Sequence, residues 1–127
     1  MADMLYLCGP MRGQPLMGFP AFDIASERLR KAGWSVVSPA DLDRAAGLSP
    51  PVDGESLDKE TLKECILRDA HALAECDTIA LLEGWEHSAG TRVEIALAHF
   101  LGMDILDAET MYPIPEEKLQ EVLPCLR

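Results

Sequence analysis

Residues 78–94 of this chain read TIALLEGWEHSAGTRVE. The segment begins with an apolar run that has the length and β-branched content of a buried strand, breaks at Gly84, and then resumes a helical pattern. A strand, a polar loop and a helix in this order are typical of the place where an α/β sheet builds a binding site. The loop and the first helical turns hold Ser88, Arg92 and Glu94, so a hydroxyl, a cation and a carboxylate lie within seven residues. We expect this segment to organise both the fold and the functional site.

The alternation of strand and helix continues on both sides of this segment. Apolar runs predict strands, and apolar residues at helical spacing predict helices. Such alternation favours right-handed parallel crossovers. We therefore expect an α/β fold: a Rossmann-like (flavodoxin-like) parallel sheet of about four to five strands with helices on both faces. The predicted strands are residues 4–8, 34–37, 78–82 and 103–106, and the predicted helices are residues 21–32, 57–76, 90–101 and 116–122.

One long connection, residues 38–58, is rich in proline and glycine and is predicted to be irregular. Loops of this length in a compact domain are usually functional or mobile. The sequence leaves open whether this one closes over the site as a lid.

The bulk composition sets limits on the class of protein. With 127 residues the chain is expected to form a single domain, residues 1–127, with a core at residues 4–106 and a C-terminal tail at residues 107–127. A formal net charge of −11 opposes binding to a nucleic acid polymer. With no apolar run long enough for a membrane span and no secretory layout, we expect a cytoplasmic protein without membrane contact. The cysteines lack paired spacing, so we expect reduced thiols and neither zinc nor disulfides; they are Cys8, Cys65, Cys76 and Cys125. The glycosidase reaction expected below implies no metal and no organic cofactor.

A glycine-bearing turn after the first strand is one candidate site. Ligands bind at the carboxyl ends of parallel strands, which gathers residues 9–13, 39–43 and 84–90 on one rim. Gly9 and Gly13 flank Arg12, so backbone N–H groups can approach an anion while the guanidinium supplies charge. An ordinary turn with a solvent-facing arginine explains the same residues equally well.

Two carboxylates, Asp69 and Glu94, are the candidate catalytic residues. Asp69 borders the apolar stripe of its helix, and a carboxylate there is either employed or paired, with Arg68 or Lys63 as partners; the residues alone favour pairing. Glu94 stands alone among apolar neighbours, although the helix dipole also favours acids near a helix start. Two carboxylates from different elements suit glycosyl transfer, with Glu94 as the nucleophile.

The loop before Glu94 supplies candidate binding residues. Ser88, with Arg12, is suited to hold a 5′-phosphate, and Gly90 lies at the start of the same helix. Trp85 is suited to stack on a base, although core packing is the more usual fate of a tryptophan.

These motifs together resemble a known family. The segments LCGPMRG (residues 7–13), FPAFD (19–23), CD (76–77) and LEGWEHSAGT (82–91), with Glu94, resemble a phage and bacterial domain family of undefined function, DUF4406. That family looks like a branch of the nucleoside 2-deoxyribosyltransferase superfamily, which includes the 2′-deoxynucleoside 5′-monophosphate N-glycosidases. The resemblance covers about residues 4–106.

The resemblance implies a role for several residues. It makes Glu94 the nucleophile, Asp69 the helix-borne partner, and Gly9, Arg12 and Gly13 a phosphate loop. Ser88 stands where the nucleoside transferases carry an aspartate and the monophosphate hydrolases a serine. A second carboxylate would repel phosphate, so the serine favours a nucleotide substrate.

The expected activity is hydrolysis of the N-glycosidic bond of a (deoxy)nucleoside 5′-monophosphate through a covalent glycosyl-enzyme on Glu94. Base exchange, as in a nucleoside 2-deoxyribosyltransferase, is the alternative, although no residue in the tail matches the one that those transferases lend to a neighbouring subunit. A nucleotide-binding sensor without turnover is a further alternative. The resemblance implies a homo-oligomer, a dimer or tetramer; the base and the 2′ preference of the sugar stay open.

Overall fold

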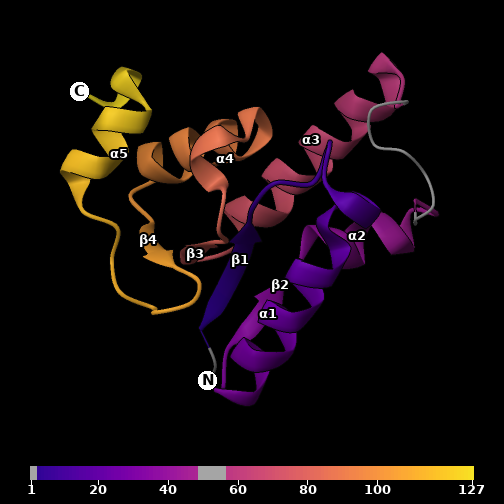
Figure 1. Ribbon diagram of the computed structural model, residues 1–127, viewed down its shortest axis with the longest axis horizontal. Helices are drawn as coiled ribbons and strands as arrows, with labels where there is room; N and C mark the ends of the chain where they lie inside the picture. Colours follow the sequence, from indigo (N-terminus) through magenta and orange to yellow (C-terminus); the bar gives the residue numbers. More distant parts are fainter. Residues whose placement is uncertain (1–2, 49–56) are drawn as a thin grey trace.

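A computed structural model describes residues 3–48 and 57–127 of the chain. Within these residues, strands and helices alternate as the sequence predicts (Figure 1). The elements in order are β1 (Met4–Cys8), the 3-10 helix η1 (Pro15–Gly18), α1 (Phe19–Lys31), β2 (Ser35–Val37), α2 (Pro39–Ala45), α3 (Lys59–Ala74), β3 (Thr78–Leu81), the 3-10 helix η3 (Trp85–His87), α4 (Ala89–Phe100), β4 (Asp104–Asp107), α5 (Glu116–Val122) and the 3-10 helix η4 (Pro124–Leu126).

The four described strands form one parallel sheet in the order β2-β1-β3-β4. β2 lies on one side of β1, whereas β3 and β4 lie on the other, so the strand order has a switch point between β1 and β3, as in flavodoxin-like folds. Such a switch point leaves a crevice outside the carboxyl ends of the strands. The predicted α/β class and the parallel sheet are confirmed. The sheet thus places the loops after β1 and β3 next to each other.

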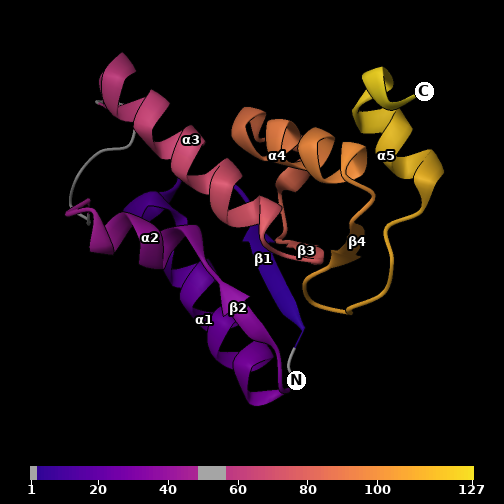
Figure 2. The same ribbon diagram turned by 180° about the vertical axis from the view of Figure 1, so that it is seen from behind.

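Side chains of β1 alternate between the two faces of the sheet because successive residues of a strand point in opposite directions. Leu5 and Leu7 enter the hydrophobic cluster formed with α1, which also holds Phe22 and Leu29. Tyr6 and Cys8 enter the other cluster, formed with α3, α4 and α5. Helices therefore cover both faces (Figures 1 and 2), and a tyrosine hydroxyl is carried into the α4 side of the core.

The segment after β2 corrects one expectation. Residues 39–43 were expected to form part of a long loop, but they belong to α2, which has Pro39 at its first turn after the extended Ser38. A proline with its fixed φ fits the first turn of a helix, where its missing N–H costs nothing. Residues 49–56 of the predicted connection lie outside the described residues, so whether this connection acts as a lid stays open.

The turn before α1 has an unusual backbone. Leu16, Met17 and Gly18 have positive φ angles of 52°, 57° and 73°, a region that side chains other than glycine occupy at a cost of about 1 kcal/mol or more each. Gly18 is also packed so closely that a Cβ there would lie 2.5 Å from the carbonyl oxygen of Pro10. The turn therefore holds the loop after β1 firmly against the start of α1.

The apolar stripe predicted for α3 serves two purposes. Leu73 is buried in the core, whereas Leu62 and Ile66 line a cleft and Leu67 is 70% exposed. One end of the helix therefore packs on the sheet, and the other forms a wall of the cleft.

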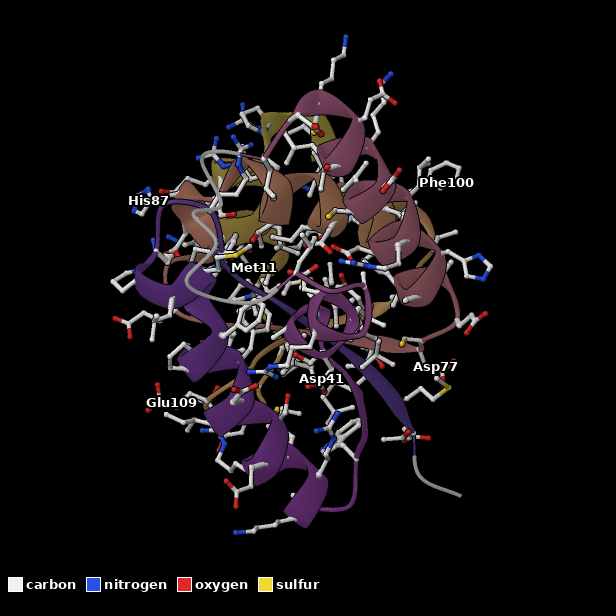
Figure 3. The ribbon with its side chains drawn as sticks, turned by 90° about the vertical axis from the view of Figure 1, so that its right-hand side faces the viewer. Met11, Asp41, Asp77, His87, Phe100 and Glu109 are labelled. Carbon is white, nitrogen blue, oxygen red and sulfur yellow. The ribbon has the colours of Figure 1, made fainter. Side chains whose placement is uncertain are left out.

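The tail returns to the domain. Ile114 donates a backbone hydrogen bond of 2.9 Å to Ile105, and α5 then lies beside α4 (Figures 1 and 2). Leu119 and Leu123 are buried in the same cluster as residues of α4, while Phe100 of α4 points outward and is 84% exposed (Figure 3). No described helix has the length and hydropathy that a membrane crossing requires.

Candidate active site

A cleft of about 1350 Å³ opens at the carboxyl ends of β1 and β3. Its walls come from the loop after β1, from α2 and α3, and from the segment between β3 and α4. Most predicted site residues line it, and they are Gly9, Arg12, Asp69, Trp85, Ser88, Gly90 and Glu94. Gly13 is not among the described lining residues. Seven of the eight residues that the sequence singled out therefore share one cleft, and their roles there stay predictions.

Glu94 lines this cleft with only 8% of its surface exposed. The Tyr6 hydroxyl donates a hydrogen bond of 2.5 Å to Oε2 of Glu94, which joins β1 to α4. Burial raises the pKa of Glu94 to about 8; the Tyr6 hydrogen bond acts against this rise, and the charge of Asp69 adds to it. A carboxyl group is thus held in one orientation in a place where its charge is poorly solvated.

Tyr6 was not predicted as a site residue, although the sequence contained a signal. It lies in the middle of the apolar strand Met4–Cys8, and its side chain is fully buried. A buried tyrosine hydroxyl normally needs a hydrogen-bond partner. Burial together with the charge of Glu94 raises the pKa of Tyr6, so the phenol remains a donor.

Asp69 faces the cleft from α3 in a partly buried position. Its Oδ1 accepts hydrogen bonds of 3.0 Å from Nε and 2.8 Å from Nη2 of Arg68. Burial raises the pKa of Asp69, while the hydrogen bonds and charge of Arg68 act to lower it. The predicted pairing with Arg68 is confirmed, and it coexists with a place in the cleft, so the pairing and the functional interpretation are compatible.

Asp43 is a cleft residue that the sequence placed on the expected rim, within residues 39–43, but did not single out as a site residue. It lies on α2, is buried, and its Oδ1 accepts a hydrogen bond of 2.5 Å from Nη2 of Arg68. Because residues 38–58 were expected to be irregular, no helix periodicity was available to place this carboxylate.

Ser88 begins α4 as its N-cap. Its Oγ accepts hydrogen bonds from the backbone N–H of Thr91 at 3.3 Å and from the Thr91 hydroxyl at 2.9 Å. Among the described residues, no acidic side chain lies in the first turn of α4. The helix dipole and this neutral cap therefore make the wall at Ser88 favourable for an anion.

The remaining loop residues divide between packing and the cleft. Gly9 is required sterically, since a Cβ there would lie 2.8 Å from Cβ of Leu82. Trp85 is buried in the core cluster and also borders the cleft. Arg12 is exposed at the cleft mouth, whereas Arg92 donates to the Glu86 carbonyl oxygen at 2.9 and 2.6 Å and supports the loop.

The four cysteines are free, with Cys8 and Cys76 buried, Cys65 half-buried and Cys125 exposed. Among residues 3–48 and 57–127, no three histidine, cysteine, aspartate or glutamate side chains are grouped so as to hold a metal ion.

The fold is similar to that of a known enzyme. A 2-deoxyribosyltransferase from the psychrotolerant bacterium Bacillus psychrosaccharolyticus superposes with a TM-score of 0.63 at 18% sequence identity, over 95% of this chain and 82% of that one. At this identity the likeness establishes the shared fold. No curated protein matches the sequence.

The sequence also matches a domain family directly. The match covers residues 3–107 and so includes β1, the cleft loops, α3, α4 and β4. Because it spans most of the chain, the protein belongs to the DUF4406 family, a domain family of unknown function.

Proposed function

We propose that this protein is an N-glycosidase that hydrolyses the N-glycosidic bond of a (deoxy)nucleoside 5′-monophosphate. One observation carries the proposal: a buried glutamate, Glu94, is oriented by a 2.5 Å hydrogen bond from Tyr6 in a cleft that Asp69 also lines. A fixed carboxylate beside a second carboxyl group is what a retaining glycosidase requires. The fold shared with a 2-deoxyribosyltransferase supports the same class of chemistry.

Catalysis proceeds in two displacements. Glu94 attacks C1′ of the sugar, the bond from C1′ to the base nitrogen breaks, and its electron pair leaves with the base, which takes up a proton. The product is a glycosyl ester on Glu94. Water then attacks C1′, gives up a proton, and releases sugar phosphate and the free glutamate.

Asp69 lies on α3 and lines the same cleft, and in this proposal it donates the proton to the departing base. Its raised pKa favours proton donation over that of an ordinary exposed aspartate. The Tyr6 hydroxyl donates to Glu94 and stabilises the carboxylate form that must attack.

In this proposal the phosphate of the substrate binds at the start of α4. Ser88 carries no charge that would repel it, and the helix N-terminus offers unpaired N–H groups. Arg12 at the cleft mouth supplies a local positive charge in a protein whose overall charge is −11. This arrangement supports a nucleotide over a free nucleoside.

The test is incubation of the protein with a panel of ribo- and deoxyribonucleoside 5′-monophosphates, followed by chromatography for free base. Wild type should release base from at least one of them, and Glu94→Gln, which keeps the shape and removes the nucleophile, should release none. If wild type releases no base, or if Glu94→Gln matches it, the proposal fails.

Base exchange is the second candidate because the structurally similar enzyme is a 2-deoxyribosyltransferase. In that reaction an added base, in place of water, attacks the glycosyl ester on Glu94. An acceptor base in the same incubation distinguishes the two, since transfer yields a new nucleotide, whereas hydrolysis yields free base and sugar phosphate without a new nucleotide.

A further inference from the structure

One arginine links two carboxylates that line the cleft from different helices. Nη2 of Arg68 donates hydrogen bonds of 2.5 Å to Oδ1 of Asp43 and 2.8 Å to Oδ1 of Asp69. Nε of the same guanidinium adds a 3.0 Å hydrogen bond to Asp69. Both hydrogens of Nη2 are therefore used, one for each carboxylate, and α2 is tied to α3 through this group.

The three side chains are sheltered from water to different degrees. The Asp43 side chain is 6% exposed, that of Asp69 15% and that of Arg68 26%. Both carboxylates border the cleft, whereas Arg68 is not among its described lining residues. Coulomb interactions are stronger in such a setting than at an open surface, so a change of charge at one carboxylate is felt at the other.

We propose that Asp43 is a positioning residue that controls, through the guanidinium of Arg68, how readily Asp69 binds and releases a proton. This inference rests on the proposed function, in which Asp69 exchanges a proton with the departing base. Asp43 itself need not touch the substrate. Arg68 is shared between two carboxylates because Asp43 is present. The charged form of Asp69 is therefore stabilised less than it would be if Arg68 paired with Asp69 alone.

The charges and pKa directions agree with this geometry. For Asp69, burial raises the pKa, the hydrogen bonds and charge of Arg68 lower it, and the charge of Asp43 raises it. For Arg68, burial favours loss of the proton, but the hydrogen bonds and charges of Asp69 and Asp43 outweigh burial and raise its pKa. The charge of Asp69 also acts on neighbouring titratable groups. It contributes to raising the pKa of Tyr6 and Cys8 on β1, of Cys65 on α3 and of Glu94 on α4.

Two substitutions should shift the pKa of Asp69 in opposite directions. Asp43→Asn removes a negative charge and leaves Arg68 to Asp69 alone, so the pKa of Asp69 should fall. Arg68→Gln removes the positive charge and leaves two carboxylates near each other, so the pKa of Asp69 should rise. A purely structural contact between α2 and α3 would give no such reversal of sign.

A matched control lies on the same helix. Asp41 is also on α2 but pairs with Arg30 and Arg44 at 3.0 and 3.1 Å. Asp41→Asn changes the net charge of the protein as Asp43→Asn does, and it should leave the Asp69 titration close to that of wild type.

The experiment is a pH titration of the aspartate carboxyl carbons by ¹³C NMR, with the Asp69 signal assigned by its loss in Asp69→Asn. It needs no substrate, so its outcome is independent of whether any nucleotide is cleaved. The expected result is a lower titration midpoint in Asp43→Asn and a higher one in Arg68→Gln. Unfolding curves identify variants that do not fold, and the comparison of Asp43→Asn with Asp41→Asn suffices if Arg68→Gln unfolds.

The inference is overturned if Asp43→Asn moves the midpoint no further than Asp41→Asn does, or moves it upward. If the midpoints shift as expected while no nucleotide is cleaved, the coupling stands and the proposed function fails. If nucleotides are cleaved, the limb of the pH-rate profile that Asp69 governs should move to lower pH in Asp43→Asn.

Discussion

Tyr6 and Glu94 are separated by 88 positions in the sequence, yet the Tyr6 hydroxyl lies 2.5 Å from Oε2 of Glu94. The contact joins the second residue of β1 that points toward α4 to the only acidic side chain buried in that helix. Tyr6 belongs to a core cluster and Glu94 is buried beside the cleft, so the Tyr6 ring cannot turn away without opening the packing between sheet and helix. The orientation of the proposed nucleophile is thus a property of the core itself.

Replacing Tyr6 by phenylalanine should lower kcat/KM for nucleotide hydrolysis by about 10- to 100-fold, because a hydrogen bond to a charged group contributes about 1.5–3 kcal/mol. The pKa of Glu94 should rise further, since Tyr6 acts to lower it. Steady-state kinetics measure the loss. Tyr112→Phe is the control, as Tyr112 is largely exposed; an equal loss in both variants would remove Tyr6 from the mechanism.

The activity should depend on pH through Glu94. The group must be ionised to attack C1′, and its pKa in the empty site is raised to about 8 by burial. Because kcat/KM reports groups of the free enzyme, ionisation of Glu94 should increase kcat/KM as pH rises toward 8, while loss of the Asp69 proton lowers kcat/KM on an opposing limb. A profile that is flat from about pH 5 to pH 9 would contradict an essential carboxylate with this pKa.

Stability should depend on pH in the opposite sense. Between the ordinary pKa of 4.5 and the folded value of about 8, the folded protein holds a proton at Glu94 that the unfolded chain has lost. The free energy of unfolding should therefore fall as pH rises through this window, by at most about 1.4 kcal/mol per pH unit from this group. Urea unfolding of wild type and Glu94→Gln at several pH values isolates the effect, since the variant lacks the titrating group. Parallel curves for the two proteins would show that Glu94 is not the cause.

Substrate charge can be tested at Ser88. Ser88→Asp keeps a good N-cap but places a carboxylate where the phosphate is proposed to bind, so the affinity for a nucleoside monophosphate should fall about 10- to 100-fold relative to Ser88→Ala. Affinity for the matching free nucleoside should not fall in parallel. Calorimetric titration of both variants with both ligands measures the difference, and equal losses for nucleotide and nucleoside would argue against a phosphate at this position.

The turn before α1 gives a prediction about stability alone. Gly18→Ala would put a Cβ 2.5 Å from the Pro10 carbonyl oxygen at a positive φ of 73°, and we expect it to destabilise the protein by about 2 kcal/mol or more. Gly102→Ala is the matched control, because its φ is 72° and nothing lies within 4 Å of the added Cβ. Thermal unfolding separates the clash from the backbone strain. Equal destabilisation in both variants would show that the contact with Pro10 relaxes freely.

Much of the fold was predictable because the strands are short apolar runs and the helices carry apolar residues at helical spacing. β1 and α5 have the predicted bounds, and the other predicted elements differ mainly at their ends. The error at α2 has a physical cause, since a proline at the start of a segment fits both a loop and the first turn of a helix. Composition alone does not separate these cases.

The candidate site was predictable where one residue carried the signal. Glu94 stands alone in an apolar helix, and Ser88 precedes a helix start, so both could be picked out from neighbouring residues. Tyr6 and Asp43 were not picked out, although Tyr6 lies in an apolar strand and Asp43 in the expected rim. The partner that gives each its role lies far away in the sequence: Glu94 for one and Arg68 for the other. Contacts of this kind depend on tertiary packing, which local patterns do not encode.

The helix α5 contributes to the hydrophobic core although it lies beyond the residues that match the family. The family match ends at residue 107, but Leu119 and Leu123 close the same cluster that holds Ile95 and Ala98 of α4. A fragment that ends at residue 107 would expose the apolar surface of α4 that these residues cover, and we expect it to self-associate. A fusion protein that contains this domain should therefore include α5, or another apolar segment that packs on α4.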